Sequence, residues 1–366
     1  MDQSSDHRLA GLSAWVNWQL YACNIYQGPP LPLAAVSGDA SFRRYFRCQL
    51  PETVALGSVI AVDAPPQHED NAAFVAVDRA LAGAGVPVPQ ILADDLEHGF
   101  LLLSDLGDTL LKQVLTPATA EPYLTVALQE IQAIMQADFS ASPLPDYSRE
   151  LLRREMELFP HWFCERFMGL TLAAPERQLL TAVFEVLEQW ALQQQQVPVH
   201  RDFHTRNLMP LANGRLGVID FQDAVRGPVT YDLVSLLRDE TFPTWDQRDV
   251  RRWVERFAAD LRLRGLGELD DQQFWLDFNA MGAQRHLKVA GIFARLHDRD
   301  GKTGYLEHTP QSIQYLLMEL QACGGDGPAC LRQFADWLIR VVVPPLVERF
   351  PASAVLFQRE RPELAW

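Results

Sequence analysis

The sequence predicts an α+β fold of two lobes, with a small β-rich N-terminal lobe before a larger helical C-terminal lobe. The chain has 366 residues, a length that suggests two domains or one large two-lobed domain. Up to residue 105, short β-like runs alternate with glycine, proline and polar turns. From Thr109 onwards, apolar residues recur at helical spacing over long stretches. We therefore expect lobes of residues 1–105 and 106–366.

The elements of the N-terminal lobe follow from apolar periodicity and turn residues. An amphipathic helix is expected first, and a proline-rich segment ends it. Two short strands come next, then a helix that stops at Gly-Ala-Gly, and then a hairpin that turns at Glu97-His98-Gly99. In chain order, these segments are residues 9–26, 41–50 (SFRRYFRCQL), 58–66 (SVIAVDAPP), 71–85 (NAAFVAVDRALAGAG) and 90–108 (QILADDLEHGFLLLSDLGD).

The C-terminal lobe is expected to be mostly helical, with short strands only around residues 197–223. Each expected helix has apolar residues three or four positions apart. The expected helices span residues 121–138, 148–169, 174–195, 229–239, 246–264, 271–297 and 309–322.

Composition excludes several functional classes. The net charge of −15 opposes nucleic-acid binding, because a polyanion requires a basic surface. No run of about 18 apolar residues predicts a membrane span, and the N-terminus lacks the pattern of a secretory signal. The 5 cysteines are odd in number and scattered, which favours reduced thiols over disulfides or a zinc site. We expect a cytoplasmic monomer whose partners are small molecules.

Two neighbouring motifs contain the chemistry. VPVHRDFHTRNLM (residues 197–209) contains His-Arg-Asp followed, five residues after Asp202, by Asn207. GVIDFQD places Asp220 at the end of a strand, after a hairpin with Asn-Gly at its turn. Phosphoryl transfer from a nucleotide requires a carboxylate for the attacking hydroxyl and oxygen ligands for a divalent ion. Either aspartate alone would be a turn or helix-cap residue, but the combined spacing favours phosphoryl transfer.

These motifs carry a resemblance to a known family. VHRDFHTRNLM, followed by GVIDFQDAVRGPVTYDLVSLLRD, resembles the catalytic core of the aminoglycoside phosphotransferase and choline kinase superfamily. The resemblance implies a two-lobed protein-kinase-like fold that uses ATP and Mg²⁺. It further implies that Asp202 is the catalytic base and that Asn207 and Asp220 bind magnesium.

The sequence departs from that family at one position. Kinase-like folds place a lysine on the third strand to hold the nucleotide phosphates, but no lysine precedes Lys112 here. Arginine can bind phosphate bidentately, and Arg43 and Arg44 follow the loop expected to cover the phosphates. The two should point to opposite faces of a strand, so at most one is expected to contact nucleotide; the alternative is that both are solvated. The expected loop residues are Ser37, Gly38, Asp39, Ala40 and Ser41, and the expected adenine hinge residues are Leu103, Ser104, Asp105 and Leu106.

The expected helix 271–297 indicates the class of acceptor. Gln284, Arg285, Lys288 and Arg295 fall within about one third of its circumference. A basic stripe would suit an anionic acceptor, whereas the alternative is a solvated face or salt bridges to the protein's own carboxylates. His204 and Asp223 are close in sequence to the motifs and are candidates for contacts to substrate hydroxyls, with a structural role as the alternative.

Further segments narrow the resemblance. SFRRYFR, DAPP and QRHLKVAGIFARLHDRDGK resemble the anomeric sugar kinases of bacterial cell-wall (peptidoglycan) recycling. The resemblance implies ATP-dependent phosphorylation of the C1 hydroxyl of N-acetylmuramate and N-acetylglucosamine to the α-1-phosphate. The lactyl carboxylate of N-acetylmuramate would meet the basic stripe. Two alternatives stay open: a phosphotransferase for an amino-alcohol or aminoglycoside, and a pseudokinase that binds ligand without turnover.

Overall fold

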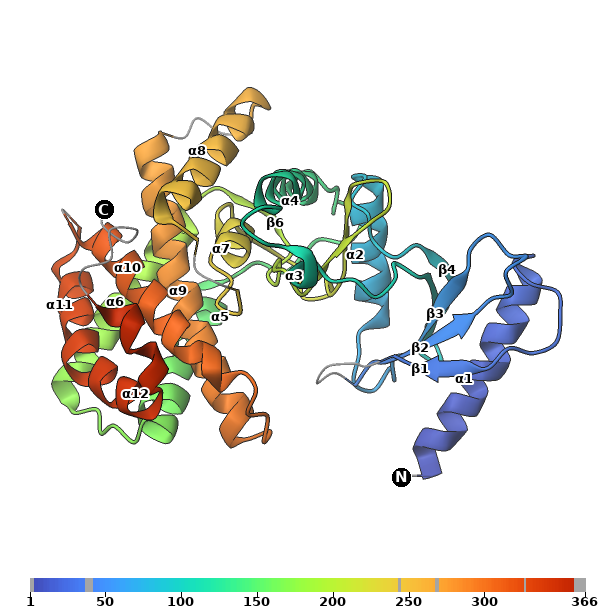
Figure 1. Cartoon of the computed structure of the whole chain (residues 1–366), viewed down its shortest axis with the longest axis horizontal. Coiled ribbons are helices and arrows are strands. Elements are labelled where there is room, and N and C mark those ends of the chain that lie inside the picture. The colour runs from blue at the N-terminus through green and yellow to red at the C-terminus, as the bar shows by residue number, and fades with distance from the viewer. Residues whose placement is uncertain (1–2, 37–41, 243–244, 267–269, 326, 359–366) are drawn as a thin grey trace. The chain divides into compact units, whose positions relative to one another are not determined.

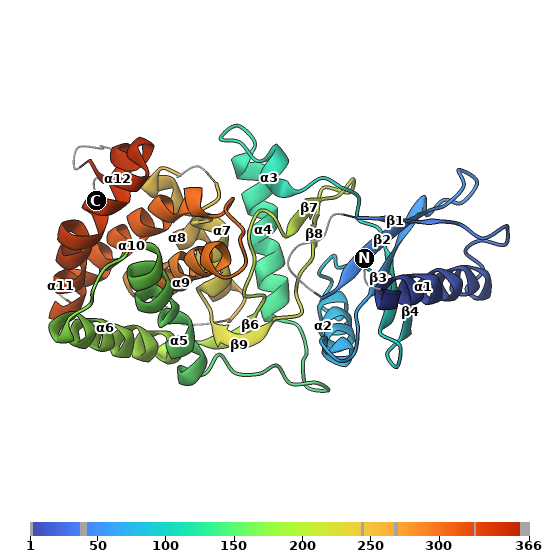
Figure 2. The same cartoon turned by 90° about the horizontal axis from the view of Figure 1, so that it is seen from below.

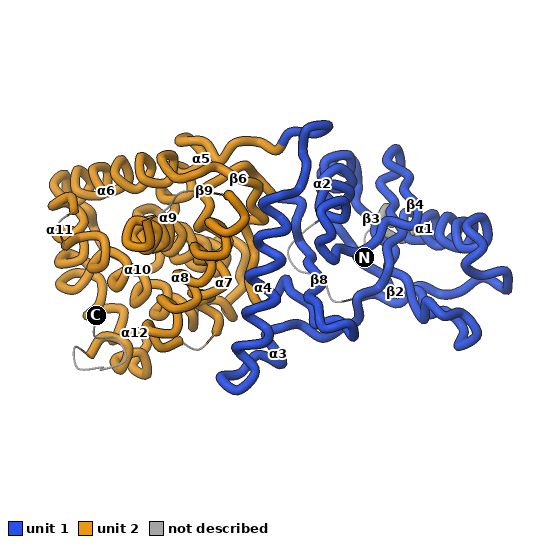
Figure 3. Tube along the Cα trace, turned by 90° about the horizontal axis from the view of Figure 1, so that it is seen from above, with its two compact units in different colours: residues 1–143, 206–223 blue, residues 144–205, 224–366 orange. Residues whose placement is uncertain are grey.

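The chain folds into two compact units. The computed structural model describes residues 3–36, 42–242, 245–266, 270–325 and 327–358 (Figure 1). Unit 1 comprises Met1–Pro143 and Arg206–Asp223, and unit 2 comprises Leu144–Thr205 and Ala224–Trp366 (Figure 3). The lobe boundary expected near residue 105 falls within unit 1, so the division into the two predicted lobes stays a prediction.

Unit 1 is built on a five-stranded antiparallel sheet in the order β1-β2-β3-β5-β4. Strands β1, β2, β3 and β4 are labelled in Figure 2. The predicted hairpin is confirmed, with Gly99 at its turn at a φ of +72° that favours glycine. A Cβ on Gly99 would also collide with the backbone oxygen of Ala64. The strands are β1 Leu33–Ala35, β2 Arg44–Gln49, β3 Ser58–Asp63, β4 Ile91–Asp95 and β5 Phe100–Ser104.

One face of this sheet is covered by the opening helix α1 (Gln3–Ala22). Leu12, Val16 and Leu20 of α1 are fully buried, and burying such a side chain contributes about 1.5–3 kcal/mol. Successive strand residues point to opposite faces, so the residues packed against α1 alternate with residues on the other face. The strand residues on the α1 side are Phe46, Cys48, Val59, Ala61, Phe100 and Leu102.

The remainder of unit 1 includes a hairpin from the middle of the chain. Its strands β7 and β8 are joined to earlier segments: the Val218 amide donates to the Pro87 carbonyl at 2.7 Å, and Arg215 pairs with Glu130. These contacts explain why Arg206–Asp223 belongs to unit 1. The elements are α2 Asn71–Gly83, α3 Leu111–Val114, α4 Ala120–Met135, β7 Leu208–Pro210 and β8 Leu216–Val218.

Unit 2 is helical, with one two-stranded sheet of β6 (Gln196–Val199) and β9 (Val225–Pro228). All seven helical stretches predicted for the C-terminal part are confirmed. The stretch 121–138 contains α4 of unit 1 and the other six lie in unit 2, where the stretch 148–169 contains α5 and a π-helical segment, η1. The helical elements are α5 Arg149–Met156, η1 Phe159–Phe167, α6 Ala174–Gln193, α7 Tyr231–Leu237, α8 Gln247–Leu263, α9 Asp271–Asp298, η2 Leu306–His308, α10 Thr309–Gly324, α11 Ala329–Trp337, η3 Leu338–Val342, α12 Val343–Arg349 and η4 Pro351–Phe357.

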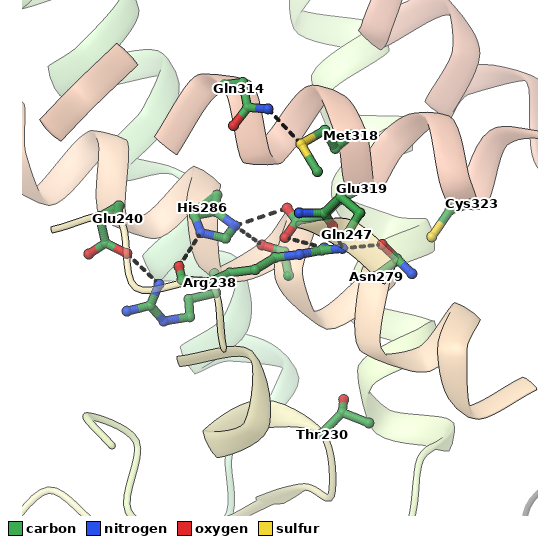
Figure 4. A network of polar contacts seen from close by, with 12 residues as sticks. Thr230, Arg238, Glu240, Gln247, Asn279, His286, Gln314, Met318, Glu319 and Cys323 are labelled. Atoms are coloured by element: carbon green, nitrogen blue, oxygen red, sulfur yellow. Dashed lines mark hydrogen bonds and ion pairs between the residues drawn. The ribbon is translucent and has the colours of Figure 1, made fainter. Parts of the chain in front are cut away.

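Helix α9 is the central helix of unit 2. It packs against α6, α7, α8, α10 and η1, and most of its residues from Phe274 to Ala294 are buried. Polar side chains on this helix therefore require internal partners. Asn279 of α9 has such a partner in Arg238, the residue that caps the end of α7. Arg238 is fully buried and donates to Asn279 at 3.0 Å and to Glu319 of α10 at 2.8 Å (Figure 4). Within the described part of the chain, no helix combines the length and apolarity needed to cross a bilayer.

Candidate active site

Unit 1 contains a pocket of about 400 Å³ on the sheet face opposite α1. This volume lies within the range of small-molecule sites, about 300–1,000 Å³. Tyr45, Arg47 and Ile60 of the sheet line it, together with residues of the segment 206–222. All four residues expected at the adenine hinge lie on its wall: Leu103, Ser104, Asp105 and Leu106.

The carboxylate of Asp105 is already engaged by the protein. It accepts hydrogen bonds from Arg47, from the Ser58 hydroxyl at 2.7 Å and from the Gly107 amide at 2.8 Å. Burial alone would raise the pKa of Asp105, but these donors lower it. The hinge is therefore held rigid by its own side chain, and its backbone is the part suited to reading a base.

Asn207 and Asp220 meet in the same pocket. Asn207 directly precedes β7 and Asp220 follows β8 by two residues, and the Asn207 amide donates to Asp220 Oδ2 at 3.3 Å. The Gln222 amide donates to the other carboxylate oxygen at 2.6 Å. Asp220 has a φ of +66°, an uncommon backbone conformation that often occurs at functional sites.

This pair fits a magnesium ion. Magnesium prefers oxygen ligands and usually takes one or two carboxylates, completing its shell with water and substrate phosphates. A carboxylate and an amide side chain in one pocket supply such oxygens.

The two predicted phosphate arginines behave differently. Arg43 is buried, lines the pocket, pairs with Glu69 at 3.2 Å and lies over the Phe74 ring at 5.0 Å. Arg44 is the first residue of β2. It pairs with Asp63 and does not line the pocket. The expectation that the two side chains point to opposite faces is confirmed. The expected loop residues Ser37, Gly38, Asp39, Ala40 and Ser41 lie outside the described residues.

Asp202 lies in unit 2, in the loop after β6. Asp232 of α7 holds the backbone of this loop, because its carboxylate accepts from the His200 amide at 2.7 Å and the Arg201 amide at 2.9 Å. Arg201 has a φ of +78°, which is strained for a residue with a long side chain. Its guanidinium pairs with Glu155. The residue that precedes Asp202 is thus fixed by both its backbone and its side chain.

The charges around Asp202 keep it ionised. Burial would raise its pKa, but Lys288, His204, His200 and Arg201 together lower the pKa of Asp202 to about 2. Lys288 itself is buried, and its ammonium lies 3.3 Å from Glu155 and donates to the Tyr231 hydroxyl at 3.0 Å. At neutral pH the Asp202 side chain is therefore a carboxylate ready to accept a hydrogen bond.

Of the basic stripe predicted on α9, Gln284, Arg285 and Lys288 are buried, and Arg295 is partly buried. Arg285 is 3% exposed and donates to Glu240 at 2.7 Å, so its charge is paired inside the protein, and a contact of Arg285 with substrate stays a prediction. Lys288 is likewise paired with Glu155. The internal salt bridges that the sequence left as an alternative are what the structure contains.

The other two candidate substrate residues differ in exposure. His204 is buried and is one of the groups that lower the pKa of Asp202 and of Asp239. Asp223 is exposed and is not among the residues that line the unit 1 pocket. Contacts to sugar hydroxyls stay a prediction for both.

Sequence reasoning missed the supports of the Asp202 loop. Glu155 and Asp232 are buried carboxylates that hold Arg201 and the loop backbone. Tyr147 donates to Glu155 and packs edge-on against Tyr231. Asp232 had a usable signal, because an acidic residue in the first turn of a short, otherwise apolar helix needs a polar partner. Glu155 gave no such signal in the sequence, because it is one of several charged residues of α5 and its partner Arg201 lies 46 residues further along the chain.

Comparison with known proteins decides the family. A model of the phosphotransferase enzyme family matches residues 32–271, more than half of the chain. The chain belongs to this family. The curated protein of Pseudomonas aeruginosa named N-acetylmuramate/N-acetylglucosamine kinase is 42% identical over 86% of this chain and 92% of its own length. The protein of the same name from Pseudomonas putida is also 42% identical, over 85% and 91%.

Solved structures agree on the fold. An ethanolamine kinase of Plasmodium vivax matches with a TM-score of 0.58 at 9% identity, covering 82% of this chain and 87% of its own. A choline/ethanolamine kinase family protein of Mesorhizobium loti matches with a TM-score of 0.57 at 13% identity, covering 88% and 99%. At such low identity the likeness shows the fold alone, and it confirms the predicted protein-kinase-like fold, with a β-sheet N-terminal region and a larger helical portion.

Proposed function

We propose that this chain is an ATP-dependent kinase that phosphorylates the C1 hydroxyl of N-acetylmuramate and N-acetylglucosamine, giving the sugar α-1-phosphate. The observation that carries the proposal is the 42% identity, over 86% of the chain, to a relative named for these two sugars. The Asp202, Asn207 and Asp220 side chains supply the chemistry that the reaction needs. We assign the enzyme to peptidoglycan recycling in the cytoplasm and expect it to act as a monomer.

Asp202 is the general base in this proposal. Its carboxylate accepts a hydrogen bond from the acceptor hydroxyl and takes the proton as the new oxygen–phosphorus bond forms. The bond between the γ-phosphorus and the bridging oxygen breaks at the same time, and ADP leaves with the electron pair. A carboxylate with a pKa of about 2 is a weak base. It suffices because the transition state is loose and an anomeric hydroxyl is more acidic than an ordinary alcohol.

The unit 1 pocket is assigned to ATP. The backbone of residues 103–106 would contact the adenine, and Asn207 and Asp220, which line the same pocket, would hold magnesium. When bound, the ion neutralises charge on the transferred phosphoryl group. Asn207 and Gln222 orient the Asp220 carboxylate through the hydrogen bonds they donate to it.

An amino-alcohol or aminoglycoside acceptor is the alternative. The ethanolamine and choline/ethanolamine kinase structures match this chain at only 9% and 13% identity, which shows the fold alone. The two relatives at 42% identity are named for amino sugars, so the amino sugars are favoured as acceptors.

A substrate panel tests the proposal. ADP release would be measured with ATP, magnesium and one of N-acetylmuramate, N-acetylglucosamine, choline or kanamycin. We expect turnover with the two amino sugars and background rates with the two cationic acceptors. Choline or kanamycin turnover without sugar turnover would refute the assignment, and ATP binding without turnover of any acceptor would favour the pseudokinase alternative.

A further inference from the structure

The proposed ATP pocket lacks the cation that kinases normally place on the third strand. No lysine precedes Lys112, and β3 (SVIAVD) carries no basic residue. The pocket face of β3 offers the apolar side chain of Ile60. In kinases a strand lysine pairs with the α- and β-phosphates and with a glutamate of the neighbouring helix. Another residue must supply that charge if the pocket holds ATP.

The neighbouring strand β2 and the residue directly before it, Arg43, supply candidates. Arg43, Tyr45 and Arg47 all line the pocket, as expected for alternate residues that share one face. Arg44, Phe46 and Cys48 point the other way: Phe46 and Cys48 pack in the core beneath α1, and Arg44 pairs with Asp63. Arg43 and Arg47 are therefore the two cations on this side of the pocket, whereas the third arginine that lines it, Arg206, comes from the segment that contains Asn207.

Strand register places these two arginines at different ends. Arg47 is opposite Ile60, which is opposite Leu103 of the proposed adenine hinge. Arg47 also pairs with Asp105 and Asp108, which raises its pKa and commits its charge to the hinge. Arg43 lies four residues away, about 13 Å along the chain at strand spacing.

The end of the pocket at which Arg43 lies is also the end that contains the proposed metal ligands, Asn207 and Asp220. Arg43 lies over the Phe74 ring at 5.0 Å, and Phe74 contacts Phe221, the residue after Asp220, with ring centroids 4.9 Å apart. Arg43 and Asp220 thus lie on either side of this pair of rings, and both line the pocket. A nucleotide with adenine at residues 103–106 and magnesium at Asp220 has its phosphates near Arg43.

Arg43 is held in place before any ligand binds. Its side chain is buried, its guanidinium pairs with Glu69 at 3.2 Å, and it lies over the Phe74 ring of α2 at 5.0 Å. Glu69 directly precedes Asp70, the N-cap of α2, so the acidic partner comes from the start of the helix. A fixed guanidinium fork loses little entropy on binding phosphate oxygens.

We propose that Arg43, positioned by Glu69 and Phe74, binds the phosphates of ATP in this chain and replaces the strand lysine of other kinases. Arg44 has no such role. The proposal rests on the proposed function, because it takes the unit 1 pocket to be the ATP site. It names the residue pair Arg43–Glu69 as the equivalent of the lysine–glutamate pair.

Binding of ATP, ADP and adenosine to the purified full chain, measured by calorimetry with magnesium present, tests the proposal. For Arg43→Ala we expect the Kd for ATP and ADP to rise about 10- to 100-fold, because the variant loses one or two charge-assisted hydrogen bonds to the phosphates. The Kd for adenosine should not change, because adenosine has no phosphate. Arg43→Lys should recover part of the ATP affinity, since it restores the charge without the fork.

Matched variants separate the phosphate contact from a general effect on folding. Arg44→Ala removes the adjacent guanidinium, which faces away from the pocket, and should leave both nucleotide affinities at the wild-type values. Glu69→Gln should weaken ATP binding less than Arg43→Ala, and should add nothing in the Arg43→Ala background. Thermal unfolding of each variant without nucleotide identifies any that fail to fold.

The possible outcomes are distinguishable. Wild-type ATP affinity in Arg43→Ala overturns the proposal, and so does an equal loss of adenosine and ATP affinity, which would make Arg43 a residue of the adenine end or of the scaffold. A wild-type chain that binds no ATP would instead refute the proposed function itself.

Discussion

At the scale of single residues, two unusual backbone conformations coincide with the two motifs. Arg201 and Asp220 both have positive φ, and each belongs to a motif that sequence spacing alone assigned to phosphoryl transfer. Such conformations cost about 1–3 kcal/mol and persist only where surrounding contacts enforce them. For Arg201 those contacts are the carboxylates of Asp232 and Glu155.

Replacing the base tests its role directly. In Asp202→Asn we expect kcat to fall about 10²- to 10⁴-fold, because the amide cannot accept the proton. The Kd for ATP should stay near the wild-type value, because every residue that lines the proposed ATP pocket belongs to unit 1. Steady-state kinetics and calorimetry measure the two quantities. An unchanged kcat would remove Asp202 from the reaction.

At the scale of elements, α2 contains a carboxyl group without a charged partner close enough to compensate its burial. Burial raises the pKa of Asp78 from 3.8 to about 7, and Arg79 offsets only part of this shift. As the pH rises above 3.8, the unfolded chain loses this proton while the folded chain retains it until about pH 7. Asp78 therefore lowers stability progressively between these two pH values and by a constant amount above them.

The matching prediction concerns Asp78→Asn. We compare the free energy of unfolding of the variant with that of the wild type at each pH. The variant's advantage should be about 2–3 kcal/mol larger at pH 8 than at pH 5, since one pKa unit corresponds to about 1.4 kcal/mol. Urea unfolding at both pH values measures the difference. A gap between variant and wild type that does not depend on pH would show that Asp78 is ionised in the folded chain.

Helix α9 makes a packing prediction. Gly291 has no room for a side chain: a Cβ would lie 2.5 Å from the Leu158 carbonyl carbon. Gly291→Ala should lower the free energy of unfolding by about 1–3 kcal/mol, although alanine is intrinsically better in a helix by about 1 kcal/mol. Gly83→Ala, at the end of α2, is the control, because nothing lies within 4 Å of its Cβ. Equal effects of the two changes on thermal unfolding would contradict the close approach of α9 and Leu158.

The same helix shows where sequence reasoning reached its limit. The motif around Asp202 and the hairpin before Asp220 were predictable, because their information lies within about two dozen consecutive residues. The sequence alone does not decide between a substrate-facing stripe and internal salt bridges for Arg285 and Lys288, because their partners, Glu240 and Glu155, are 45 or more residues away in sequence. Apolar periodicity cannot reveal that a helix is enclosed on all sides when its polar residues are paired internally.

At the scale of the whole molecule, the signature motif is divided between the two units. Asp202 belongs to unit 2, whereas Asn207 and Asp220 belong to unit 1 with the pocket. The proposed base and the proposed ATP site are thus supported by different sets of packed elements. This division predicts that variants in the base cluster alter turnover, whereas variants in the pocket alter nucleotide affinity.

The most direct test of the account is the identity of the product. Wild-type protein would be incubated with ATP, magnesium and N-acetylmuramate, and the phosphorus NMR spectrum recorded with proton coupling retained. We predict a new phosphomonoester signal whose coupling partner is the anomeric proton, together with one equivalent of ADP. A phosphate coupled to any other sugar proton, or inorganic phosphate alone, would contradict the claim that this chain is an anomeric kinase.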